Sequence, residues 1–265
     1  LATQENVDTT SPTTVITSSS GSTGSTVDDT TLNYTVTFSE PVSNFAIGDI
    51  TVTGTANGGS PAASNFAGSG ATYTFDVVRG SSDGTVVVSV AAGTATDAAG
   101  NDNTVSNTYI LTIDTVNPTI TISSTTSCGS TVDDTTLSYT VTFSEPVSDF
   151  AVGDITVTGT ANGGSPAASN FAGSGATYTF DVVRGSSDGT VVVSVAAGTA
   201  TDVSSNSNIA SNTCTFTVDT VHPIPIITSS TDSNGSTVSD LTLNYTVTFS
   251  KPVSDFAVGD ITVTG

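Results

Sequence analysis

The sequence predicts an all-β chain built from tandem Greek-key β-sandwiches, with about seven short strands in each unit. Three observations support this prediction. Apolar residues alternate with Ser and Thr over several short segments, and clusters of Gly, Asn, Asp and Ser separate these segments. No window shows the 3.6-residue period of an amphipathic helix. Finally, the same succession of segments recurs along the chain at a spacing of about 105 residues.

The recurrence determines the predicted domain organisation. The phrase FSEPVSNFAIGDITVTG at residues 38–54 returns with few changes at 143–159 and at 249–265. Residues 48–97 and 153–202 have the same sequence. We therefore predict an N-terminal segment (1–7), two complete units (8–113 and 114–218) and the first part of a third unit (219–265).

The strands of unit 2 can be predicted in order. Residues 136–143, TLSYTVTF, alternate as a strand with one buried face does, and so do residues 176–184, ATYTFDVVR. Residues 189–198, GTVVVSVAAG, are apolar at successive positions and indicate a more central strand, and residues 215–218 close the unit. Strands of this number and spacing favour an immunoglobulin-like sandwich, with a jelly roll or a barrel as the alternative.

The charge of the chain excludes some classes of function. Three basic residues stand against 24 acidic ones, which gives a formal net charge of −21. Such a surface cannot neutralise phosphates, so the chain is not a nucleic-acid-binding protein, and an anionic membrane surface would repel it. The acids occur singly or in pairs at turns, where they suit cation binding, although most of them need serve only solubility.

The sequence also suggests where the protein acts. It contains neither an apolar run that could span a membrane nor a signal peptide, and it begins at Leu1, so we expect a mature extracellular chain or an internal piece of a longer one, without direct membrane insertion. Glycosylation sequons begin at Asn33, Asn234 and Asn244. They are compatible with secretion, but a chain so rich in Ser and Thr also produces such matches by chance.

Three motifs together resemble a known family. They are a D-T-x-x-P start (DTTSP, DTVNP, DTVHP), F-S-E-P-V followed by G-D-I-T-V, and the segment TVVVSVAAGTATDAAGN at 85–101. In combination they resemble the bacterial and archaeal Ig-like domains that are strung in tandem in large adhesins, S-layer proteins and extracellular fibres. The resemblance covers both complete units and the partial third. It implies that the partners are neighbouring Ig-like units, or copies of the chain in a fibre or lattice.

In such a sandwich the start of the first strand, the loop after the second strand and the loop before the last strand lie at one pole. Several oxygen-bearing side chains would meet there, and Ca²⁺ prefers about six to eight oxygen ligands. The resemblance also implies calcium at the junctions, whereas the alternative is that these are ordinary turn residues. The candidate ligands are Asp8, Glu40, Asp49, Asp97 and Asn101 in unit 1; Asp114, Glu145, Asp154, Asp202 and Asn206 in unit 2; and Asp219 and Asp260 in unit 3.

Two further features bear on the junctions. Asp28, Asp29 and Asp83 are expected at the opposite pole of unit 1, where they would let a cation bridge two units. In unit 3, Lys251 stands at the position of Glu40 and Glu145. Its ammonium group could form ion pairs with Asp219 and Asp260 in place of part of the cation's role, or the change could be a tolerated surface substitution.

Both cysteines, Cys128 and Cys214, fall in unit 2, at the positions of Thr23 and Tyr109 in unit 1. We predict a disulfide between the end of the first strand and the last strand, with two free buried thiols as the alternative.

No catalytic constellation is predicted, because the single histidine, His222, lies in the linker segment DTVHP without a nucleophile or an acid placed around it. The favoured function is a non-catalytic structural segment of an adhesin stalk, an S-layer or a fibre. A ligand-binding module for glycans or ice and an accessory domain of a secreted enzyme are the alternatives. Residues 219–265 hold only the opening strands of a sandwich, so we expect a continuing chain or another copy to complete it.

Overall fold

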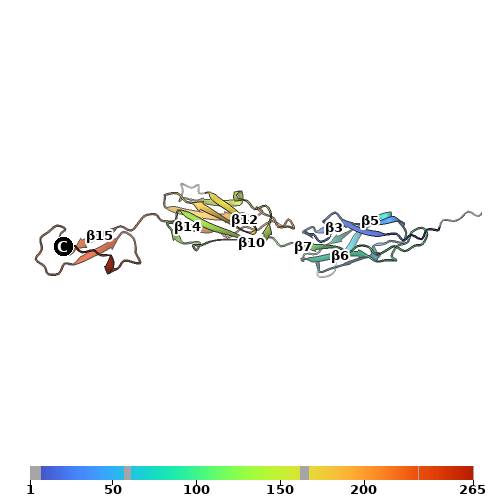
Figure 1. Cartoon of the computed structure of the whole chain (residues 1–265), viewed down its shortest axis with the longest axis horizontal. Coiled ribbons are helices and arrows are strands. Elements are labelled where there is room, and N and C mark those ends of the chain that lie inside the picture. The colour runs from blue at the N-terminus through green and yellow to red at the C-terminus, as the bar shows by residue number, and fades with distance from the viewer. Residues whose placement is uncertain (1–6, 57–60, 162–166, 232, 265) are drawn as a thin grey trace, which may run out of the picture.

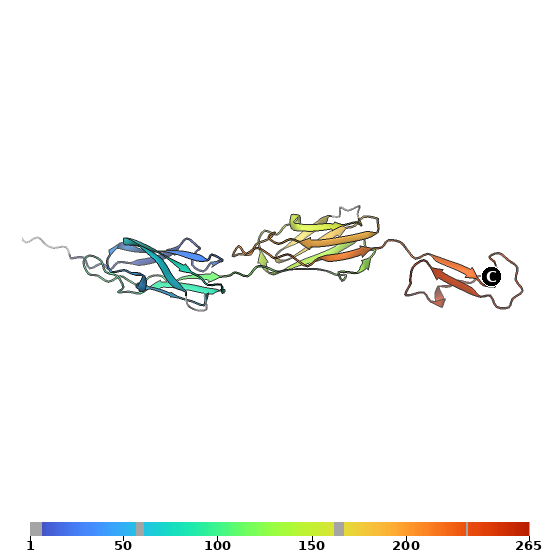
Figure 2. The same cartoon turned by 180° about the vertical axis from the view of Figure 1, so that it is seen from behind.

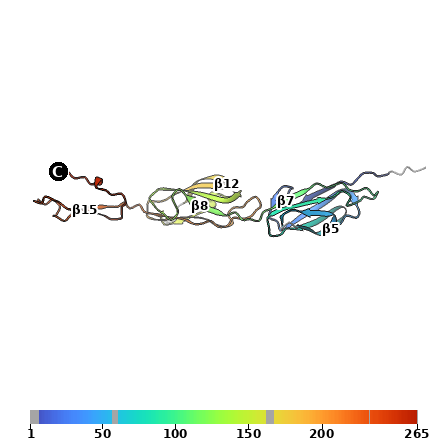
Figure 3. The same ribbon diagram turned by 90° about the horizontal axis from the view of Figure 1, so that it is seen from below.

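The structure, a computed structural model, describes residues 7–56, 61–161, 167–231 and 233–264, so most of the predicted N-terminal segment lies outside it. The regular structure is almost entirely β, and the units follow one another along a single long axis (Figures 1 and 2). Seen from below, the chain is narrow along its whole length (Figure 3). Among the described residues, no helix has the length and apolar character needed to cross a membrane.

Unit 1 contains two separate sheets. The first sheet has the strand order β1-β3-β5 and the second the order β2-β7-β6-β4, and a short 3₁₀ turn, η1, leads into β4. The elements are β1 (Thr14–Ser18), β2 (Thr26–Val27), β3 (Thr31–Val42), η1 (Ile47–Asp49), β4 (Ile50–Thr53), β5 (Ala62–Val78), β6 (Gly84–Val90) and β7 (Tyr109–Ile113).

Unit 2 repeats this topology, with the orders β12-β10-β8 and β11-β13-β14-β9. Its elements are β8 (Ile120–Ser124), β9 (Thr131–Val132), β10 (Thr136–Val147), η2 (Val152–Asp154), β11 (Ile155–Gly159), β12 (Ala168–Val183), β13 (Gly189–Val195) and β14 (Cys214–Val218). The described residues thus hold seven strands per unit in two sheets. This arrangement confirms the predicted sandwich.

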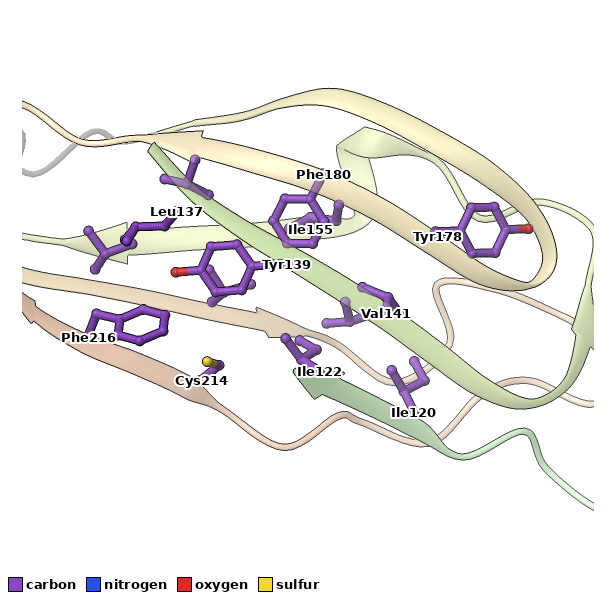
Figure 4. Packing of buried hydrophobic residues seen from close by; sticks show 14 of the residues in the cluster. Ile120, Ile122, Leu137, Tyr139, Val141, Ile155, Tyr178, Phe180, Cys214 and Phe216 are labelled. Atoms are coloured by element: carbon purple, nitrogen blue, oxygen red, sulfur yellow. The ribbon is translucent and has the colours of Figure 1, made fainter. Parts of the chain in front are cut away.

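The predicted alternation decides which side chains form the core. In β10 the four apolar residues Leu137, Tyr139, Val141 and Phe143 are buried, and the polar residues between them are not. They pack among residues from the other strands of the unit, as Figure 4 shows for Tyr139 beside Phe180 and Phe216. The strand β13 pairs with β11 on one side and β14 on the other, so the apolar run at 189–198 does form a central strand.

An asparagine side chain protects the free edge of the first strand in each unit. The strand β8 pairs only with β10, and the amide of Asn212 bonds to the outer side of β8: its Oδ1 accepts from Ile122 N at 2.7 Å, and its Nδ2 donates to Ile122 O at 3.0 Å. Asn107 makes the same pair of bonds to Ile16 in unit 1. Since an amide carries both a donor and an acceptor, one side chain substitutes there for a neighbouring strand.

The predicted disulfide is present between Cys128 and Cys214, with Cα atoms 5.1 Å apart. Unit 1 holds the same place with hydrogen bonds. The Tyr109 hydroxyl donates to Gly21 O at 2.5 Å, and the Thr23 hydroxyl oxygen accepts from Ile110 N at 3.0 Å. A covalent bond in one unit therefore corresponds to two hydrogen bonds in the other.

A core tyrosine in each unit carries an uncompensated polar group. The hydroxyls of Tyr34 and Tyr139 are buried, and neither has a hydrogen-bond partner in the part of the chain that the structure describes. Because an unpaired buried hydroxyl opposes folding, we expect Tyr139→Phe to raise the free energy of unfolding of unit 2 by up to about 1 kcal/mol. Tyr109→Phe, which removes a bonded hydroxyl, should lower that of unit 1 by about the same amount, as measured by calorimetry. A loss of stability in Tyr139→Phe would contradict this explanation.

Unit 3 contains the paired strands β15 (Pro225–Ser229) and β16 (Tyr245–Phe249) and the turn η3 (Val258–Asp260). Within residues 219–231 and 233–264 no second sheet covers this pair, and Tyr245 is 63% exposed, whereas its counterpart Tyr139 is 2% exposed. How this sandwich is completed stays a prediction.

Candidate metal centre

Three carboxylates meet at one pole of each complete unit. Asp8, Glu40 and Asp97 form the unit 1 triad, and Asp114, Glu145 and Asp202 form the unit 2 triad; in each, one carboxylate oxygen per residue lies within 4.8 Å of the others. The first member precedes the first strand, the second lies near the end of the long strand β3 or β10, and the third lies in the loop before the last strand. The sandwich topology thus brings together residues about 90 positions apart, as the sequence predicted for these six.

The long strand of each unit has an irregular register at the glutamate of the triad. The pairing of β10 with β12 shifts register between Thr142 and Val147, and β3 has the same irregularity between Thr37 and Val42. Glu145 and Glu40 lie within these irregular stretches. A bulge changes the direction in which a strand's side chains point, which accounts for a strand glutamate that reaches the pole.

The third member of each triad is buried and organises its own loop. Asp202 is 4% exposed, and its Oδ1 accepts from the backbone N–H groups of Ser204 and Asn206 at 2.7 and 2.9 Å. Its Oδ2 accepts from Asn206 Nδ2 at 2.9 Å. Asp97 has the same arrangement with Ala99 and Asn101, whose side-chain hydrogen bond above all lowers the pKa of Asp97. The bonds to Asp97 favour its ionised form.

The predicted asparagines lie beside the triads and connect the loop to the linker. Asn206 Nδ2 also donates to Asp114 O at 3.0 Å, and Asn101 Nδ2 donates to Asp8 O at 3.2 Å. Through its amide nitrogen, each asparagine therefore joins the backbone carbonyl of the first triad residue to the carboxylate of the third. These bonds assign it a positioning role.

Like charges face each other inside the triads. Burial, and then the carboxylates of Asp8 and Asp97, raise the pKa of Glu40. Burial, and then Asp114, Asp202 and Asp83, raise the pKa of Glu145. No salt bridge compensates either triad within the described residues. A divalent cation would relieve this repulsion, and the oxygens fit Ca²⁺, since two oxygens that face each other across that ion are about 5 Å apart.

Comparison with known proteins places these units in a family. The sequence profile of the family described as "Bacterial Ig-like domain" matches residues 8–113 and residues 114–218. The chain belongs to this family of bacterial Ig-like domains. The two Ig-like units therefore account for most of the chain, and the matched segments begin at Asp8 and Asp114, the first members of the two triads.

Searches among other known proteins add less. No curated protein matches the sequence. Among solved structures, the N-terminal part of the bacterial S-layer protein SbsC is similar at 16% identity with a TM-score of 0.29, and the Yersinia pseudotuberculosis adhesin InvE at 15% identity with a TM-score of 0.27. The alignments cover 79% and 78% of this chain, but only 44% and 58% of the other two.

Three of the predicted ligands close local turns instead of joining a triad. The carboxylates of Asp49, Asp154 and Asp260 each accept a hydrogen bond at 2.8 Å from the backbone N–H three residues earlier, and so close the turns η1, η2 and η3. Asp49 and Asp154 are not part of the triads. The structure thus assigns the aspartate of G-D-I-T-V to local turn formation.

The linker between Ig-like units 1 and 2 is held from the unit 1 side. Asp83 Oδ1 accepts from Thr115 N at 2.9 Å and from Thr115 Oγ1 at 2.7 Å. Asp83 thus lies near the unit 2 triad, as its effect on Glu145 indicates. Asp28 and Asp29 contribute their backbone carbonyls, which accept hydrogen bonds from the Arg79 guanidinium.

In unit 3 the predicted ion pair of Lys251 is present. Lys251 Nζ lies 2.5 Å from Asp219 Oδ1 and 2.6 Å from Asp219 Oδ2, and it donates to Val221 O at 2.8 Å. Asp260 instead closes its own turn. In unit 3, Asp219 thus stands at the first position of the triad, and the ammonium group of Lys251 stands at the second.

The remaining candidates lie on the surface. The sequon residues Asn33, Asn234 and Asn244 are exposed, and so is His222 in the linker. Exposure is compatible with glycosylation, which stays a prediction.

The sequence analysis missed one buried asparagine in each unit. Asn208 is 2% exposed and makes bonds from both ends of its amide. Its Oδ1 accepts from Thr199 N and Ala200 N at 2.8 and 2.7 Å, and its Nδ2 donates to Ala196 O and Ile209 O at 2.8 and 2.9 Å. Asn103 occupies the same position in unit 1. In the sequence it resembled an ordinary turn residue.

Asn208→Ala should lower the free energy of unfolding of unit 2 by roughly 2 kcal/mol, because it leaves two buried N–H groups without acceptors. Ser207→Ala, at the exposed neighbouring position, should change it by less than about 0.5 kcal/mol. Calorimetry of the two variants measures both values. Equal stabilities would contradict the role assigned to Asn208.

Proposed function

We propose that this chain is a non-catalytic, load-bearing segment of a bacterial surface protein, in which calcium bound at the poles of the Ig-like units stiffens the array. The unit 2 triad carries this proposal. It places three carboxylates together next to the linker between two units, and no cationic side chain of the described residues forms a salt bridge with them. Asp83 of the preceding unit holds that same linker.

The three residues of the unit 2 triad would each bring a carboxylate to the calcium ion from a different part of the chain. Asp202 is fixed by its loop, so it provides an oriented carboxylate. Asp114 belongs to the linker, and Glu145 reaches the pole from β10. When bound, calcium supplies positive charge and a fixed arrangement of oxygens. Because it would join the linker to two other parts of unit 2, it would restrict the angle between unit 1 and unit 2.

Several properties of the chain support a role in a surface array over a role in binding a small molecule. The units are nearly identical and follow one another through short linkers, as in repeat proteins built from stacked copies of one domain. The extracellular location and the assembly into an adhesin stalk, an S-layer or a fibre are part of the proposal. The disulfide supports an oxidising environment.

Chelation tests the proposed function. Small-angle scattering and calorimetry of the chain in EDTA and in calcium should show a longer, stiffer particle and a higher melting temperature in calcium. Magnesium at the same concentration provides the comparison ion. If EDTA alters neither the maximum dimension nor the melting temperature, the calcium role fails.

A specific observation favours one second candidate, a ligand-binding module for glycans or ice. Thr residues stand opposite one another on the outer face of β10 and β12, with Thr142 paired to Thr177 and Thr140 to Thr179. Such a hydroxyl-bearing surface could contact an ordered polar ligand. Glycan-array binding or inhibition of ice recrystallisation by the chain would support this candidate, and Thr142→Val with Thr177→Val should then abolish it.

A further inference from the structure

The linker between units 2 and 3 is held at three successive residues. Lys251 of unit 3 contacts the first and the third, through the Asp219 carboxylate and the Val221 carbonyl. Asp188 of unit 2 holds the residue between them, since its Oδ1 accepts from Thr220 N and Thr220 Oγ1, both at 2.7 Å. Side chains of both units therefore bond to one short segment.

The linker between units 1 and 2 is held from the unit 2 side by neutral groups, since Asn206 Nδ2 donates to Asp114 O at 3.0 Å and Ser204 Oγ donates to Asp114 Oδ2 at 3.3 Å. On the unit 1 side, the Asp83 carboxylate accepts hydrogen bonds from Thr115, as the Asp188 carboxylate does from Thr220. On the unit 2 side, however, the position of Lys251 is occupied by Glu145, whose carboxylate faces Asp114 and Asp202. One junction thus contains an attractive pair of charges where the other contains a repulsive group of three.

The electrostatic effects agree with this geometry. The hydrogen bond from Lys251 is the main cause that lowers the pKa of Asp219, whereas burial, and then the carboxylates of Asp114 and Asp202, raise the pKa of Glu145. Lys251 also helps to lower the pKa of Asp188, after the larger effect of Thr220. The ammonium group therefore lies close to acids of both units.

We propose that Lys251 takes the place of the divalent cation at the junction between units 2 and 3, so that this junction is held with and without calcium. The contrast with the other junction rests on the proposed function, but the contacts of Lys251 need no metal. The array then contains one junction that responds to calcium and one that does not. Bending in the absence of calcium would concentrate between units 1 and 2.

An exposed ion pair between two flexible side chains holds little by itself. Here the ammonium also bonds to a backbone carbonyl, and the residue between its two contacts is fixed by Asp188. The three contacts restrict the backbone of the linker directly. They are therefore expected to act on the angle between units more than on the stability of either unit.

Introducing the lysine into unit 2, both of whose sheets are described, tests the inference. Spin labels on keto amino acids at the exposed positions Thr72 and Thr177 report the distance between units 1 and 2 and leave the disulfide intact. In the wild-type chain the distance distribution should be narrow in calcium and at least twofold broader in EDTA. Glu145→Lys should keep it narrow in both. Glu145→Gln, the control without an ammonium group, should leave it broad in both.

A second pair of labels, at Thr177 and Thr248, reports on the junction that contains Lys251. The wild-type distribution should have the same width in calcium and in EDTA, and Lys251→Gln should broaden it at least twofold in both. If Lys251→Gln leaves the width unchanged, or Glu145→Lys behaves as Glu145→Gln does in EDTA, the inference is overturned. If instead the wild-type distance distribution between units 1 and 2 has the same width in calcium and in EDTA, the proposed function fails. The Lys251→Gln comparison then still decides the role of the lysine.

Discussion

Replacing Cys128 and Cys214 with serine should lower the free energy of unfolding of unit 2 by roughly 4 kcal/mol, because the bond closes a span of 86 residues in the unfolded chain. Calorimetry should resolve this as a lower melting temperature for the unit 2 transition. The transition of unit 1 serves as a control within the same molecule, since both cysteines lie in unit 2.

A second variant separates the covalent bond from the packing at that place. Cys128→Thr with Cys214→Tyr copies the residues of unit 1, where the Tyr109 hydroxyl bonds to a backbone carbonyl. It should restore part of the stability that the serine variant loses, because hydrogen bonds and an aromatic ring replace the disulfide. A serine variant as stable as the wild-type chain would show that the disulfide contributes nothing.

Glu145→Gln should have opposite effects on unit 2 in EDTA and in calcium. In EDTA the wild-type triad contains three carboxylates that repel one another, so the variant should be the more stable of the two. In calcium at 100 times its Kd, the wild-type unit should gain about 2.7 kcal/mol, and the variant, which lacks one ligand, should gain little. Thermal unfolding of the wild-type chain and the variant, each in EDTA and in calcium, measures whether their order of stability reverses.

The pH dependence in EDTA provides a further check on the same residue. The folded state raises the pKa of Glu145, so folding favours its protonated form. Relative to Glu145→Gln, the wild-type unit should therefore lose stability as the pH rises through the raised pKa, and be least stable above it. Asp133→Asn, which removes one exposed charge outside the triad, should not show this difference. A parallel pH profile for wild type and Glu145→Gln would contradict the repulsion.

Much of the fold could be predicted because the order of apolar and polar residues within a short segment is enough to indicate a strand. The alternation in TLSYTVTF specifies which face of β10 is buried, and the apolar run at 189–198 specifies a central strand. The disulfide followed from the confinement of both cysteines to one unit. The two triads followed from the order of the strands, which places three loops at one pole.

The finer roles of polar residues could not be predicted, because they depend on partners that the sequence does not identify. Asp154 looked like a ligand from its place after the long strand, but its carboxylate reaches a backbone N–H only three residues away. Asn208 and Asn212 carry no signal in the sequence that singles them out, yet one bonds through both ends of its amide inside unit 2 and the other pairs with the edge of β8, 90 residues earlier. An isolated Asp or Asn has the same sequence signature in all these roles.

Counting bound calcium tests the central claim most directly. Isothermal titration of the chain with calcium should show two sites, one for each triad, and one site should disappear in Glu145→Gln while the other remains. Glu40→Gln is the matched variant for unit 1, and Lys251 leaves no site in unit 3. Two sites in the wild-type chain and one in each variant would support calcium at the poles of the Ig-like units. No calcium binding, or binding that neither variant alters, would contradict it.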